Sequence, residues 1–115
     1  MQVTICTANC VGQAGNCSYP NKVTVVTPEQ LQEAVKKDHV CAEFKGNYRS
    51  IENFIRSDVI VMDIDNDHTE VPADWITAEK LEELFPNVEY LLAPSRHHLL
   101  DKEGKSARPR YHMYF

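Results

Sequence analysis

The segment from residue 58 to residue 65 constrains the fold more than any other part of the chain. Its nearly continuous apolar run, Val59-Ile60-Val61-Met62 with Ile64, predicts a strand that is buried on both faces and central in its sheet. Two acids lie at the end of this run, and because side chains alternate along a strand, Asp63 and Asp65 share one face. Neighbouring carboxylates on a buried strand repel each other unless a cation neutralises them. The pattern therefore predicts that Asp63 and Asp65 bind Mg²⁺ or Mn²⁺, and a solvated turn through Asn66 and Asp67 is the alternative.

The remaining elements are short and alternate. Helices are predicted after Thr27, which precedes Pro28 and Gln30 in a capping pattern, and after Thr77. Strands are predicted at residues 2–6, 22–26, 40–44, 88–93 and 111–115. This order favours an α+β fold: an RRM-like or ferredoxin-like split β-α-β sheet with an additional N-terminal strand and loop. The length of 115 residues fits one domain, with the N-terminal strand and Cys-containing loop at 1–21 and the core at 22–115.

The charge of the chain is unevenly distributed. The net charge of −5 argues against a broadly basic polyanion-binding protein, yet residues 95–115 hold five basic and two acidic side chains. This predicts a cationic arm for phosphate, although a solvated loop explains the same residues about as well. No apolar run approaches the roughly 18 residues that cross a bilayer, and the first residues lack an export signal. A cytoplasmic protein without a membrane partner is expected.

The last predicted strand carries a second group of polar residues. Arg110, His112 and Tyr114 share one face of this strand, and Tyr111, Met113 and Phe115 share the other. An Arg and a His beside two metal-binding acids form a receptor for a nucleoside triphosphate whose phosphates reach the metal. The predicted nucleotide-binding residues are His112, Arg110, Arg108 and Lys105. For His112 alone, a strand histidine without a ligand remains the alternative.

These two groups of residues resemble a known family. Asp63-Ile64-Asp65 at the end of an apolar strand, followed about fifty residues later by His112 in Tyr-His-Met-Tyr-Phe, is similar to the first two motifs of archaeo-eukaryotic primases. The resemblance is to the primase-polymerases of bacterial mobile elements and prophages, and it covers roughly residues 40–115, with residues 17–20 also similar. It implies that Asp63 and Asp65 hold the catalytic metals and that His112 contacts the phosphates of the incoming nucleotide. Arg110 departs from the family, which often has a small residue at this position.

The resemblance predicts a DNA primase-polymerase that joins nucleotides by two-metal catalysis in the replication of mobile-element or phage DNA. Its expected partners are nucleoside triphosphates, a single-stranded DNA template, and a helicase or other replication proteins. The family's third metal-binding acid has no counterpart before Phe115, so this chain is expected to be a truncated catalytic core that gains activity when extended. A noncatalytic RRM-like nucleic-acid-binding module and a metal-dependent phosphoesterase are the alternatives.

The four cysteines, Cys6, Cys10, Cys17 and Cys41, are irregularly spaced and contain no Cys-x-x-Cys pair. A zinc site with Cys41 or His39 as the fourth ligand is one interpretation. Buried or free thiols without a metal are the favoured one.

Overall fold

The computed structural model describes all residues from 1 to 115, and its contacts divide the chain into two compact units. Unit 1 is Met1–Ile60 and unit 2 is Val61–Phe115. Each unit holds one α-helix and antiparallel strands, so the predicted α+β class is confirmed. The prediction of a single domain over residues 1–115, with an N-terminal strand and loop at 1–21 and a core at 22–115, stays a prediction. No helix is both long and apolar enough to span a bilayer.

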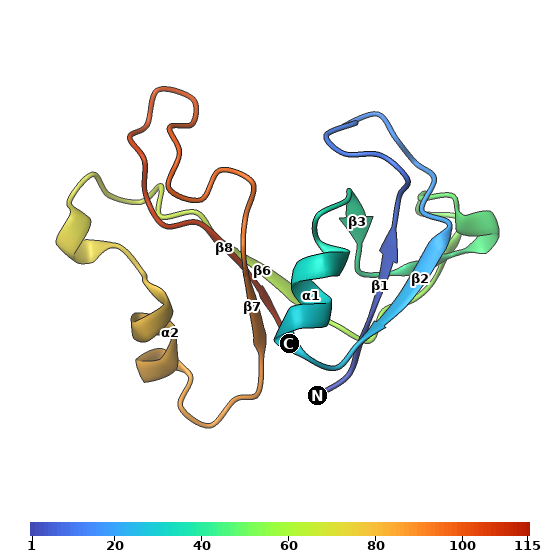
Figure 1. Ribbon diagram of the computed structural model, residues 1–115, viewed down its shortest axis with the longest axis horizontal. Helices are drawn as coiled ribbons and strands as arrows, with labels where there is room; N and C mark the ends of the chain where they lie inside the picture. The colour runs from blue at the N-terminus through green and yellow to red at the C-terminus, as the bar shows by residue number, and fades with distance from the viewer. The chain divides into compact units, whose positions relative to one another are not determined.

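Unit 1 is built on a three-stranded antiparallel sheet in the order β2-β1-β3 (Figure 1). The central strand β1 (Val3–Thr7) is buried along its whole length, as its β-branched and apolar residues favour. It pairs with β2 (Asn21–Val25) on one side and with the short β3 (His39–Val40) on the other. The helix α1 (Pro28–Ala34) follows β2 and contacts it.

Both helices begin where the local sequence predicts. Thr27 caps α1 and completes a capping box with Gln30, and Thr77 caps α2 (Ala78–Leu84) in unit 2. Each helix has only seven residues, which is too short to be stable alone in water. Their buried side chains, Leu31 in α1 and Leu81 in α2, therefore attach them to the rest of each unit.

A second, two-stranded sheet in unit 1 differs from the sequence prediction. The strand expected at 40–44 is broken, because β3 ends at Val40 and β4 (Glu43–Phe44) pairs instead with β5 (Phe54–Arg56). The polar sequence between residues 47 and 53 hid β5 from prediction. A 3₁₀ turn (Lys45–Asn47) follows β4, and Gly46 and Asn47 both take positive φ angles there, which reverses the chain toward β5.

Unit 2 holds a three-stranded antiparallel sheet in the order β6-β8-β7. Its strands are β6 (Val61–Ile64), β7 (Leu91–Pro94) and β8 (Tyr111–Tyr114). The 3₁₀ helix Pro72–Asp74 and α2 lie between β6 and β7 in the chain, and α2 packs against one face of the sheet (Figure 1). Leu81 of α2 forms the core there with Ile64 and Met113.

The structure corrects two expectations about the apolar segment 58–65. The prediction that its strand is central is wrong, because β8 lies in the middle of this sheet and β6 lies at its edge. The strand also begins at Val61 rather than Asp58. The Asp58 carboxylate instead accepts hydrogen bonds from the backbone N–H and the hydroxyl of Thr4, at 2.9 and 2.8 Å, and belongs to unit 1.

Candidate functional site

Asp63 and His112 lie directly opposite each other on adjacent strands. The antiparallel register pairs Asp63 of β6 with His112 of β8, and His112 Nε2 is 3.2 Å from Asp63 Oδ1. The two side chains therefore share one face of this sheet. The Asp63 side chain is 68% exposed, so desolvation does not force a cation onto it as the buried-strand argument assumed. What the edge position provides instead is an accessible carboxylate beside an imidazole.

Asp65 lies just beyond the end of β6, in a more crowded environment. Its carboxylate is 3.8 Å from Arg110 Nη1 and 3.9 Å from Lys102 Nζ. Two cations therefore already face the second acid of the predicted metal pair. A metal ion that used both Asp63 and Asp65 would share Asp65 with these cations.

Arg110 is fully buried and holds the turn that follows β6. Its Nη1 donates to the backbone carbonyl of Asp65 and to Asp67 Oδ1, both at 2.9 Å. The hydrogen bond from Arg110, supported by the charges of Lys105 and Lys102, holds the pKa of Asp67 below its ordinary value. The Nε and Nη2 atoms of Arg110 are buried without a hydrogen-bond partner in the protein.

Arg108 is also fully buried, but all of its donors are used within unit 2. It donates to the backbone carbonyls of Asn66, Thr69 and Ser106, to the Glu70 carboxylate and to the Ser106 hydroxyl. Its guanidinium also lies over the Trp75 ring, 5.2 Å from the centroid. Arg108 thus has no spare N–H for a phosphate in this conformation.

Like Arg108 and Arg110, Lys105 lies beside an acid of the segment after β6, with its Nζ 3.6 Å from Asp67 Oδ2. Four basic residues of the predicted cationic arm, Lys102, Lys105, Arg108 and Arg110, therefore contact the acidic segment 65–70. Their role in nucleotide binding stays a prediction. The structure gives them a second role, which is to hold the segment that follows Asp63.

Asn66 is a structural residue of this site that the sequence prediction treated only as part of a turn. It is buried with a φ of 56°, a left-handed conformation that Asn tolerates better than most residues. Its side-chain amide donates to the carbonyls of Ile76 and Pro109, at 2.9 and 2.8 Å, and accepts from Ile76 N. It thereby connects the end of β6 to the segments that lead into α2 and β8. The turn-forming sequence Asp65-Asn66-Asp67 was the signal from which this role of Asn66 could have been predicted.

The cysteines are all free thiols. Burial is the main cause that raises the pKa of Cys41 to about 12, and it also raises the pKa of Cys6. Cys10 Sγ lies 4.0 Å from Asp38 Oδ2 in a loop whose Gly12 and Gln13 N–H groups donate to the same carboxylate. The structure contains no group of three or more His, Cys, Asp or Glu side chains that could hold a metal ion, among the cysteines or elsewhere.

The donor set at Asp63 and Asp65 nevertheless fits one kind of metal ion. Mg²⁺ keeps several waters and is bound in many enzymes by one or two carboxylates together with substrate phosphates, so a complete protein cage is not required. Asp63 offers an accessible oxygen ligand of this type, and Asp65 lies two residues further along the chain.

No protein-family model, no curated protein and no solved structure matches this chain. A functional assignment therefore depends on the geometry of the site and on the motif resemblance.

Asp67 provides a test of how much its hydrogen bond from Arg110 contributes to the stability of the turn after β6. Because its pKa is lowered in the folded state, its contribution to stability is present above its ordinary pKa of 3.8 and is lost as the pH falls through the lower folded value. Asp67→Asn is expected to decrease the free energy of unfolding at neutral pH and to flatten its decline below about pH 4. Denaturant titrations between neutral pH and pH 2 measure both effects. Asp74→Asn, an exposed acid on the 3₁₀ helix, is the control, and an unchanged acid limb in Asp67→Asn would contradict the assignment.

Proposed function

We propose that this chain belongs to the catalytic domain of a cytoplasmic primase-polymerase, which transfers nucleotides onto a growing strand on a DNA template. The observation that carries the proposal is the cross-strand pair of Asp63 and His112, with Asp65 two residues beyond. An accessible carboxylate on β6, an imidazole on the neighbouring β8 and a second carboxylate just beyond β6 match the residue types that the primase motifs require. Asp63 lies on the edge strand and its side chain is largely exposed, so its carboxylate is accessible to a ligand.

Each residue has a distinct role in this proposal. Asp63 and Asp65 hold Mg²⁺ or Mn²⁺, which when bound neutralises the triphosphate and activates the attacking hydroxyl. His112 Nε2 lies 3.2 Å from Asp63 Oδ1, so this carboxylate orients the imidazole, and the oriented ring donates a hydrogen bond to a phosphate oxygen. Arg110 fixes the backbone of Asp65 and is a positioning residue, because its unpartnered Nε and Nη2 atoms are buried.

The topology of unit 2 supports the RRM-like part of the proposal. β8 runs antiparallel to both β6 and β7, so β6 and β7 point the same way with β8 between them. The connection of β6 to β7 through α2 agrees with the split β-α-β unit that we propose. A noncatalytic RRM-like module would need aromatic side chains open on the sheet face. Tyr111 and Phe115 instead pack against the core around Leu81, which favours a catalytic domain over a noncatalytic RRM-like module.

Nucleotide binding tests the proposal. His112→Ala is expected to weaken the binding of a nonhydrolysable nucleoside triphosphate in the presence of Mg²⁺ by about tenfold, because one charge-assisted hydrogen bond contributes about 1.5–3 kcal/mol. NMR chemical-shift titration of the chain measures the affinity and locates the contact. The expected pattern is a set of shifts at the β6–β8 edge, including the His112 imidazole.

His97→Ala is the matched control, since His97 lies in the loop between β7 and β8. Equal nucleotide affinities for the wild type and His112→Ala would overturn the assigned role of His112. Absence of any nucleotide-dependent shift at the β6–β8 edge would overturn the proposed function.

A further inference from the structure

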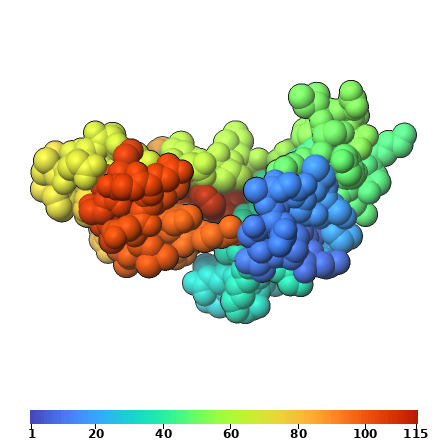
Figure 2. Space-filling view, turned by 90° about the horizontal axis from the view of Figure 1, so that it is seen from above, coloured from blue at the N-terminus to red at the C-terminus, as the bar shows by residue number.

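The hairpin formed by β4 and β5 in unit 1 exposes an unusual amount of aromatic and apolar surface. Tyr48 and Phe54 are each 54% exposed, and Ile51 is 97% exposed. Phe54 also meets Phe44 edge to face, with 6.2 Å between the ring centroids. The hairpin belongs to the green segment that projects from unit 1 in Figure 2. Large exposed apolar side chains grouped in this way are typical of interaction surfaces.

Two exposed cations and one exposed acid, Glu52, lie among these aromatic residues. Lys45 and Arg49 are exposed, and neither forms an ion pair with a carboxylate. Glu52 lies between Ile51 and Phe54 in the chain. The other acid of the hairpin, Glu43, is occupied by Lys22 and Arg56, which hold its pKa below the ordinary value. We call Lys45, Tyr48, Arg49, Ile51 and Phe54 the hairpin surface.

The distribution of charge over the two units agrees with this local picture. Unit 1 has six basic and six acidic residues, whereas unit 2 has six basic and eleven acidic ones. The whole negative excess of the chain therefore belongs to unit 2. A polyanion approaching the hairpin surface meets no net repulsion from unit 1.

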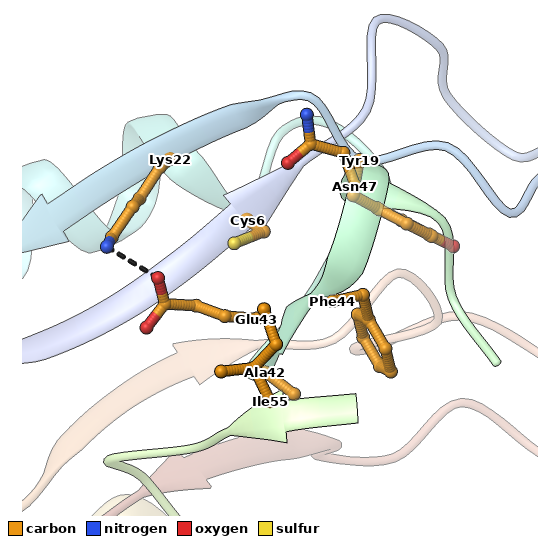
Figure 3. Close-up of a pocket in the computed structure, with 8 residues that line it drawn as sticks. All are labelled: Cys6, Tyr19, Lys22, Ala42, Glu43, Phe44, Asn47 and Ile55. Carbon is orange, nitrogen blue, oxygen red and sulfur yellow. Dashed lines mark ion pairs between the residues drawn. The ribbon is translucent and has the colours of Figure 1, made fainter. Parts of the chain in front are cut away.

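A pocket of about 180 Å³ lies beside the hairpin surface (Figure 3). Tyr19, Phe44 and Ile55 provide apolar walls, while Asn47 and the ion pair of Lys22 with Glu43 provide polar groups at its border. A buried cavity of roughly 150 Å³ holds a benzene ring, so this pocket has room for one planar ring but not for a whole nucleotide. Arg49 lies against the Tyr19 ring, 5.6 Å from its centroid, and so connects the pocket to the hairpin surface.

We propose that the hairpin surface and its pocket bind single-stranded nucleic acid. Exposed rings of Tyr48 and Phe54 stack on unpaired bases, Lys45 and Arg49 contact the phosphates, and the pocket accepts one base. Surfaces for single strands combine these two features, because every base has a face that stacks on an aromatic ring and every linkage carries a negative charge. An apolar patch alone would suit a protein partner equally well. The two unpaired cations beside the rings favour the polyanion.

The proposal concerns unit 1 and does not depend on Asp63 or on a metal ion, so it stands or falls separately from the nucleotidyltransferase proposal. The experiment is fluorescence anisotropy with a labelled oligodeoxythymidine, at low salt and with a chelator present. Phe54→Ala is expected to weaken binding by about tenfold, since each base stacked on an aromatic ring contributes about 1–3 kcal/mol. Lys45→Glu/Arg49→Glu is expected to weaken it further and to reduce its dependence on salt concentration.

The controls match these variants in chemistry and are placed elsewhere in unit 1. Lys37→Glu changes an exposed cation after α1, and Val11→Ala shortens an exposed apolar side chain in the N-terminal loop. Both are expected to bind like the wild type. All substituted side chains are exposed, so the variants are expected to fold. Absence of binding by the wild type would overturn the proposal and leave the surface to a protein partner. Wild-type affinity in both Phe54→Ala and Lys45→Glu/Arg49→Glu would also overturn it. So would a loss of affinity in Lys37→Glu as large as the loss in Lys45→Glu/Arg49→Glu.

Discussion

Replacing Asp63 and Asp65 together by Asn is expected to reduce the affinity of the chain for Mn²⁺ by at least about 100-fold, if each carboxylate contributes a factor of about ten. The two substitutions keep the side-chain shape and remove the two negative charges that attract the ion. The single variants are expected to differ from each other. Asp63 is the more exposed acid and faces His112, whereas Asp65 is shared with Arg110 and Lys102. Asp63→Asn is therefore expected to cost more affinity than Asp65→Asn.

Isothermal titration calorimetry with Mn²⁺ measures these affinities, and paramagnetic broadening of NMR signals from β6 and β8 locates the ion. Asp74→Asn removes the same charge from the exposed 3₁₀ helix of unit 2 and is the matched control. If the double variant binds Mn²⁺ as tightly as the wild type, the metal site is not at these residues. A loss of the same size in Asp74→Asn would mean that the affinity reflects the overall charge of unit 2.

The second large effect is expected from Arg108, which is buried with every donor in use. Arg108→Met is expected to decrease the free energy of unfolding of unit 2 by about 3–5 kcal/mol, because each carbonyl left without its partner costs about 1–3 kcal/mol. Arg108→Lys is expected to fall between Met and the wild type. An ammonium group keeps the charge but cannot reproduce the five donors of the guanidinium fork.

Trp75 offers a direct measurement, because it is the only tryptophan of the chain and the Arg108 guanidinium lies over its ring. Denaturant titrations followed by its fluorescence give the free energy of unfolding of unit 2. Lys80→Met, on the exposed side of α2, is the control and is expected to change stability by less than about 1 kcal/mol. If Arg108→Met is as stable as Lys80→Met, then Arg108 is not a structural residue of the acidic segment.

The sequence was informative where the physical signal was local. The Thr27 and Gln30 capping box lies within four residues, so α1 could be placed without knowledge of the rest of the fold. The alternation of side chains likewise put His112 on one face of its strand and Met113 on the other. The capping box depends on the geometry of one helical turn, and the alternation depends on the geometry of neighbouring strand residues. Both agree with the structure.

The sequence was misleading where several segments compete for one partner. The apolar run before Asp63 predicted a central strand. In the structure β8 is central, since it pairs with both β6 and β7. β5 was missed for a similar reason, since its pairing with β4 depends on a turn with positive φ at Gly46 and Asn47 and not on its own composition. Strand pairing is a choice among distant segments, and local propensity does not make that choice.

By itself, the sequence determined the α+β class, the two helix starts and the residues that can share a face with Asp63. Only the tertiary structure decided that Asp63 is paired with His112, that Asp65 is shared with cations, and that Arg108 and Arg110 are buried rather than exposed. The physical reason is the same in each case. A buried guanidinium is stable only when its donors find acceptors, and those of Arg108 and Arg110 include carbonyls about forty residues earlier in the chain, which the fold alone brings within reach.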